Sequence, residues 1–472
     1  LYDNNRAKGP KLNGADSDWN AVDDYVLKGL QAAKASGKKV VILTPSLPSP
    51  STKKIIEDFK VVYPTTEHVV YDAVSYSPAL DAAQEVYGVR ALPLYDLTKA
   101  ELLVSFGADF LNDWNGGHLE SDYAKAKTPG ATMLKHIQVE SNLSLSGASS
   151  DERMPLKPSA VQKLLAEVYK ALNGSSSDAN AQKLAKELQA KGSKAVVFAE
   201  GDKSSYVLAY LINQKLNSEA VRKDKVLLTK ESNDTRFGEL VSWLSSGQVG
   251  VFMNFNTNPV YSYSDGEKLG QLLAKVPCSV SLTEYENETA VTAKALAPVP
   301  HWLESWGDVN PATGVYLLSQ PTIQRIFDTR QFQDSLLQWK KTVAAVAVSS
   351  NEATKATTDS TGVAADSSAA VTNKVSADGT TPFNSNYTTT TATPVQTNAY
   401  YNFLKQFWQA QLGASLGYSF NQALYNGYNE TSESVSLAAG GDAQKALSDI
   451  AAIKGGELEL NLYTKTAIGD GT

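Results

Sequence analysis

The sequence predicts an α/β fold with two lobes of mostly parallel sheet. Short apolar runs rich in β-branched residues alternate with amphipathic helices, and this alternation is typical of parallel strands joined by crossover helices. The alternation occurs in two successive sets along the 472 residues, a length that exceeds one core of ordinary size. Hydrophobic residues at 42% and charged residues at 20% lie in the ordinary globular range, so we expect the chain to fold.

The first set of elements opens with a helix whose apolar positions recur at three- and four-residue spacing before a glycine stop: Trp19, Val22, Val26, Leu30, Ala33 and Gly37. We then predict a strand at 40–44, a helix at 52–59, a helix opened by Ser77 and Pro78 and closed by Gly88, and strands at 102–107 and 136–140. Ser159 and Gln162 form a capping-box pattern before an apolar stripe, which predicts a further helix at Val161, Leu164, Leu165, Val168 and Leu172.

The second set predicts strands at 195–198, 226–228, 250–255 and 278–282, with helices at 204–216 and 237–244. The polar stretch at 173–181 has the composition of a flexible connection. We therefore divide the chain into a first lobe at 1–173 and a second lobe at 174–343. Residues 344–398, rich in Ala, Ser and Thr, predict a surface insertion. Residues 399–472 predict a C-terminal segment with a strand-like ELELNLYT run, leading to a further domain of a longer protein.

Composition and missing motifs exclude several classes of function. The net charge of −7 without blocks of like charge argues against nucleic acid as a partner. Cys278 is the single cysteine, so the chain forms no internal disulfide and does not supply the four thiolates of an iron–sulfur cluster. The sequence contains no apolar run near the roughly 18 residues of a membrane span, and no phosphate-loop, zinc-protease or hydrolase-elbow motif.

Two loops after predicted strands carry polar residues of the kind that bind ligands at a sheet edge. The loop GADFLNDWNGG, which includes Gly107, Asp109 and Asn112, lacks the GxGxxG spacing, and a plain strand-to-loop turn is the favoured interpretation. Asn254, Asn256 and Asn258 follow the strand at 250–255. Both an Asn-Pro turn and a vestigial binding loop remain open interpretations there.

The remaining polar cluster is His301, Glu304 and Asp308, whose spacing would bring three metal ligands together on a helix. Gly307 and the flanking prolines oppose a helix, so we favour a hydrogen-bonded structural loop. The other histidines, His68, His118 and His136, lie apart from other ligand types in the sequence. We predict no catalytic residue and no metal ligand in this chain.

Several of these segments, in this order, resemble the large subunit of the molybdopterin-guanine-dinucleotide oxidoreductases. They are LYDNNRAKGP at 1–10, DLTKAELLVSFGADF at 96–110, VFMNFNTNPVYS at 251–262 and the stretch at 286–323. The resemblance implies two Rossmann-like lobes, as in the middle domains of that family, which grip the two halves of the pterin cofactor.

The sequence departs from that family where cofactor-binding members carry their motifs. Glu140, Ser141 and Asn142 replace the tail of one motif; Ser159, Ala160 and Val161 replace another after Pro158; Asp308 and Val315 replace a threonine and an arginine. The resemblance therefore implies that cofactor and molybdenum are absent. It leaves vestigial pterin-site loops at Gly107, Asp109, Asn112, Asn254, Asn256, Asn258, Glu304, Gly307 and Asp308.

Within this superfamily the chain looks most like the molybdopterin-like half of the large iron–sulfur subunit of bacterial alternative complex III. LTPSLPSPSTKKIIEDF, SNLSLSGASSDERMPLKPS, HWLESWGD and SQPTIQRIFDTRQFQDSLLQW carry this likeness. It implies a ferredoxin-like half with iron–sulfur clusters beyond Thr472, haem cytochromes, polysulfide-reductase-type membrane subunits, a terminal oxidase as a further neighbour, and a place on the periplasmic face of the inner membrane.

The leading functional hypothesis is a non-catalytic scaffold of this quinol-oxidising electron-transfer complex. It positions the cluster-bearing half and the cytochromes. Two alternatives come from other classes. One is a cofactor-bearing molybdopterin oxidoreductase domain, and the other is a periplasmic protein that binds a small ligand between its two lobes.

Overall fold

The computed structural model of the chain describes residues 1–112, 114–130, 132–340 and 399–463. Its strands are β1 (Lys11–Leu12), β2 (Ala15–Asp16), β3 (Lys39–Thr44), β4 (Thr66–Val70), β5 (Leu92–Tyr95), β6 (Leu102–Phe106), β7 (Lys135–Glu140), β8 (Glu152–Pro155), β9 (Ala195–Ala199), β10 (Val221–Leu227), β11 (Val249–Phe255), β12 (Cys278–Leu282), β13 (Ala295–Leu296), β14 (Gly307–Ala312), β15 (Val315–Ser319) and β16 (Tyr428–Glu430).

The α-helices are α1 (Trp19–Ser36), α2 (Pro50–Val62), α3 (Ser77–Tyr87), α4 (Glu120–Ala126), α5 (Leu145–Ala148), α6 (Pro158–Leu172), α7 (Ala179–Lys191), α8 (Lys203–Lys215), α9 (Asp234–Ser245), α10 (Pro259–Ser262), α11 (Gly266–Leu273), α12 (Glu288–Thr292), α13 (Phe332–Trp339), α15 (Ala399–Gln411), α16 (Gly413–Leu416), α17 (Phe420–Asn426) and α18 (Ala443–Ala451). Short 3-10 turns are η1 (Leu97–Lys99), η2 (Trp114–Gly116), η3 (Gly192–Lys194) and η4 (Trp302–Glu304).

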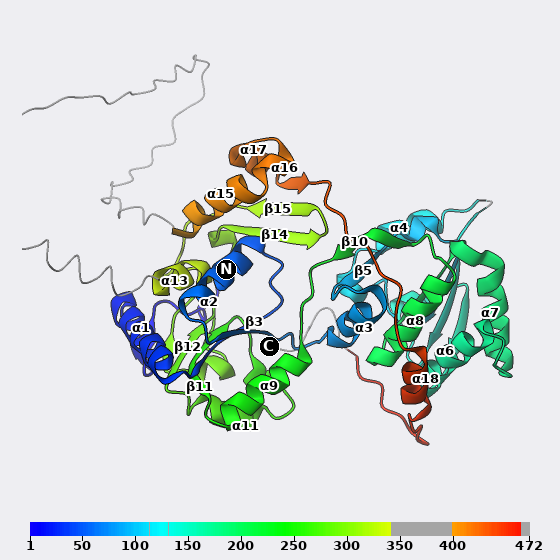
Figure 1. The fold of residues 1–472 in the computed structure, drawn as a ribbon, viewed down its shortest axis with the longest axis horizontal. Helices are drawn as coiled ribbons and strands as arrows, with labels where there is room; N and C mark the ends of the chain where they lie inside the picture. The colour runs from blue at the N-terminus through cyan, green and yellow to red at the C-terminus, as the bar shows by residue number, and fades with distance from the viewer. Residues whose placement is uncertain (113, 131, 341–398, 464–472) are drawn as a thin grey trace, which may run out of the picture.

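Two lobes lie side by side, and each is built on a largely parallel sheet (Figure 1). The seven-stranded lobe has the strand order β2-β1-β13-β12-β11-β3-β4, with only β1 and β2 antiparallel to their neighbours. The four-stranded lobe has the order β8-β7-β6-β9 and is parallel throughout. The predicted fold class, an α/β fold with two Rossmann-like lobes of mostly parallel sheet, is thereby confirmed.

A third sheet, with the order β16-β15-β14-β10-β5, is antiparallel throughout and joins strands from both sides of the molecule. The predicted strand at 226–228 belongs to this sheet, as β10, and pairs with no parallel neighbour. Local sequence pattern marks a strand but contains no information about its partners, so the third sheet was not predicted.

The four-stranded lobe is an insertion within the seven-stranded lobe. The chain leaves the seven-stranded lobe after β4, builds residues 77–227, and returns to form α9 and β11, which pairs in parallel with β3. Likewise β6 pairs with β9 across the predicted boundary. A division into 1–173 and 174–343 therefore does not separate the sheets, because the stretch at 173–181 merely connects α6 to α7. The predicted insertion at 344–398 lies outside the described residues.

Parallel strands buried on both faces organise the two cores. Along β3, Val40 and Ile42 face one side of the sheet and Val41 and Leu43 the other, and all four are at most 1% exposed. Helices α1, α2, α13 and α15 cover the first side, and α9 and α11 cover the second. Because both faces are buried, the strand reads as a continuous apolar run.

Helix ends follow from local chemistry at most positions. The α1 helix begins after Asp18, whose carboxylate accepts the Ala21 N–H at 2.8 Å, and ends at Gly37 with φ +66°. The predicted capping box at α6 is wrong: the cap position is Lys157, and Ser159 lies in the first helical turn. Pro158 sets this start because its fixed φ suits the first position of a helix.

The C-terminal segment contributes to both lobes, as its orange-to-red path in Figure 1 shows. From α15, the buried side chains of Tyr400, Leu404 and Trp408 complete the core of the seven-stranded lobe. Farther on, α18 packs against α8 and α6 of the four-stranded lobe, where Ile450 is buried. Residues 457–463 form no strand, which contradicts the predicted ELELNLYT strand over its described part.

Candidate functional site

The loop after β6 holds the first group of predicted site residues. Gly107 has φ +79°, a conformation that favours glycine, and the chain passes close to the Glu200 carbonyl there. Asp109 Oδ1 accepts the Ser146 N–H at 2.9 Å, and the Asn112 N–H donates to the Asp109 carbonyl at 3.0 Å. These bonds tie the loop to itself and to α5, so it forms a closed strand-to-loop turn.

The neighbouring strand β7 ends in Glu140, which is 3% exposed and fully engaged by its own lobe. Its carboxylate accepts from Arg153 Nε at 2.6 Å, from Ser144 Oγ at 2.6 Å and from Gln138 Nε2 at 3.3 Å. Gly147 leaves the room that this carboxylate fills, since a Cβ at that position would lie 1.9 Å from Glu140 Oε1. A side chain of the protein therefore occupies the carboxyl edge of this sheet, where α/β folds usually bind ligands.

The asparagine group lies after β11 in the seven-stranded lobe. Asn254 donates to the Thr257 carbonyl at 2.9 Å and is 1% exposed, and Asn256 has φ +46°, which asparagine tolerates. Asn258 donates to Glu288 at 2.7 Å and accepts from the Thr289 N–H and hydroxyl at 3.1 and 2.9 Å. Pro259 then begins α10. The loop thus has the bonds of an Asn-Pro turn tied to α12.

The third group, Glu304, Gly307 and Asp308, does not converge on one point. Glu304 forms a buried ion pair with Arg6 at 2.7 Å and accepts the His301 N–H at 2.8 Å. Burial would raise the pKa of Glu304, but the hydrogen bonds from Arg6 and from two backbone N–H groups hold it below its ordinary value. His301 caps the η4 turn through its ring, so these residues form a hydrogen-bonded loop.

Asp308 points away from this loop, into the interface between β14, α2 and α15. Its carboxylate accepts from Ser49 Oγ at 2.5 Å, Ser51 Oγ at 2.7 Å, the Ser51 N–H at 3.3 Å and Trp408 Nε1 at 3.0 Å. Burial raises the pKa of Asp308 above its ordinary value despite these donors. Gly307 lies beside it, with Ser319 close on the paired strand β15.

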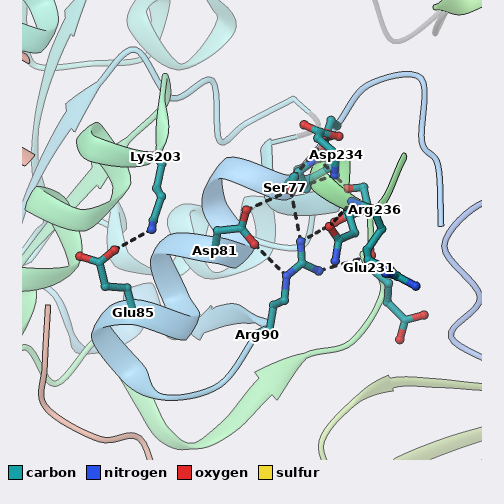
Figure 2. Close-up of polar contacts among 12 residues, drawn as sticks. Ser77, Asp81, Glu85, Arg90, Lys203, Glu231, Asp234 and Arg236 are labelled. Atoms are coloured by element: carbon teal, nitrogen blue, oxygen red, sulfur yellow. Dashed lines mark hydrogen bonds and ion pairs between the residues drawn. The ribbon is translucent and has the colours of Figure 1, made fainter. Parts of the chain in front are cut away.

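The two chain crossings between the lobes meet at a polar cluster that the sequence did not predict (Figure 2). Arg90 Nε donates to Asp81 at 2.8 Å, and its Nη2 donates to the Ser232 carbonyl at 2.7 Å and to Ser77 Oγ at 3.2 Å. The Asp234 N–H also donates to Ser77 Oγ at 3.3 Å. The cluster thus fastens the start of α3 to the segment that leads into α9.

A cleft of about 400 Å³ opens next to this cluster, lined by Asp81, Gln84, Glu85, Lys203, Asn233, Thr235 and Arg236. Its two cations already have partners. Lys203 pairs with Glu85 at 2.6 Å, and Arg236 pairs with Glu67 at 2.7 Å and with Glu239. A ligand would have to break these pairs, so the cleft offers little to a small anion between the lobes.

Of the isolated histidines, His136 is buried, whereas His68 and His118 are half-buried. His68 accepts or donates a hydrogen bond with Thr44 at 2.9 Å, and His136 is hydrogen-bonded to Tyr123 and Gln138. Burial lowers the pKa of both imidazoles to about 4. Within the described residues no set of three His, Cys, Asp or Glu side chains is placed to hold a metal ion, and no helix is long and apolar enough to cross a membrane.

The predicted site residues therefore lie in four places: the loop after β6, the loop after β11, the loop around Glu304, and the interface that Asp308 enters. In each place they make their hydrogen bonds with neighbouring residues of the protein. Sequence reasoning missed Arg6, Arg90 and Arg153, the cations that pair with Glu304, Asp81 and Glu140. The Arg6–Glu304 partners are 298 residues apart, so no local pattern connects them. The departure from the cofactor-binding motif at Glu140 was the one signal in the sequence that could have pointed to its pairing with Arg153.

Comparisons with known proteins agree with this fold. No protein-family model matches the chain. Over 109 residues it is 32% identical to the menaquinone reductase molybdopterin-binding-like subunit of Nitratidesulfovibrio vulgaris (strain Hildenborough), a match that covers 21% of the chain and 16% of that subunit. Among solved structures, acetylene hydratase from Pelobacter acetylenicus superposes with a TM-score of 0.55 at 11% identity, covering 74% of this chain and 62% of that one.

The formyltransferase/hydrolase complex of Methylorubrum extorquens, solved with methylofuran, contributes a second similar chain with a TM-score of 0.52 at 14% identity. That match covers 72% of this chain and 100% of the other. At these identities the likeness concerns the fold alone. The chain thus shares its two-lobed α/β fold with these structures and is related, over part of its sequence, to a molybdopterin-binding-like subunit of a quinone reductase.

Proposed function

We propose that this chain is a non-catalytic scaffold module of a quinone-linked electron-transfer complex, with a molybdopterin-oxidoreductase-like fold that has lost its cofactor. The partial similarity to the menaquinone reductase subunit supports the electron-transfer setting. The hydrogen bond of Glu140 with Arg153 and its packing against Gly147 support the loss of the cofactor, and this observation carries the proposal.

The residues at the edge of the four-stranded sheet do not fit a pyrophosphate. Glu140 is enclosed beside Gly147 and held by Arg153 and Ser144, so an approaching phosphate would meet a fixed negative charge. The nearest cation, Arg153, is already paired with that carboxylate at 2.6 Å. A binding site for a dinucleotide needs exposed donors at this edge, and here the donors face the protein's own carboxylate.

The complex that we propose is alternative complex III, on the strength of the segments that resemble its iron–sulfur subunit. In that setting the partners are a ferredoxin-like half that carries the clusters, haem cytochromes, polysulfide-reductase-type membrane subunits and a terminal oxidase. The place of action is the periplasmic face of the inner membrane. The buried pair Arg6–Glu304 and the Arg90 cluster suit this role, because they fix chain segments in place and need no catalytic function.

Metal and pterin analysis of the purified complex tests the loss of the cofactor. We expect molybdenum and tungsten far below one atom per chain by inductively coupled plasma mass spectrometry, and no pterin fluorescence after oxidation. A molybdopterin enzyme purified in parallel serves as the positive control. One molybdenum or tungsten atom with pterin per chain would favour the catalytic alternative and defeat the proposal.

Cross-linking of the native complex, read by mass spectrometry, tests the scaffold role. We expect cross-links from this chain to a cluster-bearing polypeptide and to a haem cytochrome. Recovery of the chain as an isolated monomer with a small molecule bound between the lobes would instead support the ligand-binding alternative.

A further inference from the structure

Residues 457–463, with the alternating sequence ELELNLY, follow α18 and lie outside the three sheets. Leu458, Leu460 and Leu462 are 93%, 80% and 82% exposed. Exposed leucines normally occur singly, and a group of them marks a surface that binds something. In a β-strand, residues at a spacing of two lie on one face. The segment therefore has the pattern of an amphipathic strand, with leucine on one face and glutamate and asparagine on the other.

The polar face of this segment is already fastened to the four-stranded lobe. The Ser159 N–H donates to Glu459 Oε2 at 2.9 Å, and the Ser159 hydroxyl donates to Oε1 at 2.7 Å. Lys157 Nζ donates to the carbonyls of Gly456 at 3.0 Å and Glu457 at 2.8 Å. Because Glu459 faces the lobe, the leucines on either side of it are left to solvent, as their exposure shows.

The backbone of the segment also lacks partners within the described part of the chain. No backbone N–H or carbonyl group of residues 458–463 makes a hydrogen bond with a described residue. An occupant that covers the leucines must also pair these groups, since burying them unpaired costs free energy. A helix or a small apolar molecule would leave them unpaired. A second β-strand supplies both the apolar side chains and the backbone partners.

Size and charge indicate that this strand belongs to a different polypeptide and not to a second copy of the chain. A stable interface takes roughly 20 to 30 residues from each side, and the segment is far shorter. Two copies would each carry a net charge of −7 and repel one another. Glu457 and Glu459 make the polar face acidic, so basic residues opposite them are favoured.

We propose that residues 457–463 form a docking strand that adds to the exposed edge of a β-sheet in a partner polypeptide. Apolar residues of the partner face the leucines, and basic residues lie opposite the glutamates. Docking turns the segment into a strand and buries its leucines. The inference goes beyond the scaffold function, because it names a binding surface and the chemistry of what binds there. It requires a partner, but it does not depend on which complex contains the chain.

Hydrogen exchange of the full chain, read by mass spectrometry with a synthetic strand present, tests the docking. The probe is a short labelled peptide of alternating valine and lysine, and its binding is followed by fluorescence anisotropy. At saturation we expect amides of 458–463 to exchange about tenfold more slowly, because they become donors in a strand ladder. A peptide with glutamate in place of lysine should bind about tenfold more weakly. Absence of binding, or binding without slower exchange in 458–463, would overturn the proposal.

Variants separate the strand from other apolar surface. Leu460→Asn and Leu460→Pro should each weaken the lysine peptide about tenfold, since the first removes an apolar contact and the second also removes a backbone donor. Leu143→Asn is the matched control, because Leu143 is 62% exposed on the same lobe but lies outside the segment. It should bind the peptide like the wild type. Equal weakening in Leu143→Asn would show unspecific apolar binding and refute the docking strand.

The native complex provides a second arm of the test. Amides of 458–463 should exchange more slowly in the purified complex than in the isolated chain, and equal exchange would contradict the docking. Light scattering of the isolated chain should give a monomer. A dimer that Leu460→Asn dissociates would make a second copy the occupant and overturn the proposal. None of these readings depends on metal or pterin content, so a failure here is distinguishable from a failure of the scaffold proposal.

Discussion

Asp308 is one of the buried residues of the predicted site, at 2% exposure, and its role is to join three elements. One carboxylate oxygen accepts from the hydroxyls of Ser49 and Ser51, and the other accepts from the Ser51 and Trp408 N–H groups. Hydroxyls can also accept hydrogen bonds, whereas the N–H groups cannot. The oxygen that faces the two hydroxyls can therefore be replaced by a donor such as an amide NH2 group, whereas the oxygen that faces the two N–H groups must remain an acceptor.

Asp308→Ala should lower the free energy of unfolding by about 2–5 kcal/mol, because it leaves buried donors without an acceptor. Asp308→Asn should cost less than about 1.5 kcal/mol, since its oxygen can face the two N–H groups and its nitrogen the two hydroxyls. Urea unfolding measures both. Asp265→Ala, at an exposed carboxylate, is the control and should stay within about 0.5 kcal/mol of the wild type. Equal losses for Ala and Asn would contradict this account of the site.

His68 and His136 make the stability of the protein depend on pH in the acid range. The pKa of His68 and of His136 is about 4, below the ordinary value near 6.5, so the unfolded state binds more protons in this interval. Their stabilising contribution is present above pH 6.5 and is lost as the pH falls through 4, by on the order of 3 kcal/mol for each residue. We expect His68→Gln/His136→Gln to show a flatter decline of unfolding free energy between pH 6.5 and 4. A slope equal to that of the wild type would contradict this contribution of His68 and His136 to stability.

At the scale of elements, the start of α3 and the segment before α9 act as one unit. Both belong to chain crossings between the lobes, and Arg90 links them by donating to Asp81, Ser77 and the Ser232 carbonyl. Two of these acceptors lie in α3 and one lies 142 residues later in the chain. The guanidinium fork suits this arrangement because it donates in several fixed directions.

Arg90→Ala should lower the free energy of unfolding by about 1–2 kcal/mol and speed amide exchange in residues 229–234, because it removes the link between the crossings. The side chain is a quarter exposed, so the upper end of the range for charged hydrogen bonds does not apply. Arg222→Ala removes an exposed pair with Asp224 within β10 and should change neither quantity by much. Unchanged exchange at 229–234 in Arg90→Ala would mean that other contacts hold the crossings together.

At the scale of the whole molecule, the C-terminal segment connects two separate cores. Trp408 of α15 belongs to the core of the seven-stranded lobe, and Ile450 of α18 belongs to that of the four-stranded lobe. Between them β16 extends the antiparallel sheet, and the Val435 and Ala438 N–H groups donate to carbonyls of Asp224 and Tyr87. The segment therefore stabilises each lobe through a different side chain.

Trp408→Ala should lower stability by about 3–5 kcal/mol and Ile450→Ala by about 2–5 kcal/mol, because each leaves a cavity in a packed core. We expect the effects to be local: exchange should rise in β3 and β11 for Trp408→Ala, and in α6 and α8 for Ile450→Ala. Hydrogen exchange resolved by peptide measures both. A uniform increase over both lobes in either variant would show a single cooperative unit instead.

Periodicity was enough to predict most of the elements of the two parallel sheets. The apolar spacing of Trp19 to Ala33 gave α1, and continuous apolar runs gave β3, β6 and β11, because each of these segments is buried in a way that its own residues record. The loops with Gly107 and Asn258 were also placed correctly after their strands. Local pattern does not record partners, which is why the antiparallel sheet and the pairing of β3 with β11 were missed.

The α/β class, strands β3, β6, β7, β9, β11 and β12 of the two parallel sheets, and the residues that depart from cofactor-binding motifs could be predicted from the sequence, because they depend on local spacing and residue type. The roles of those residues depend on the tertiary structure. Glu140 faces Arg153 of the adjacent strand, Glu304 faces Arg6 and Asp308 faces Trp408. The last two pairs form only when distant segments of the chain fold together. Burial and partner choice depend on the whole chain, so these carboxylates became parts of the framework through packing that no local pattern contains.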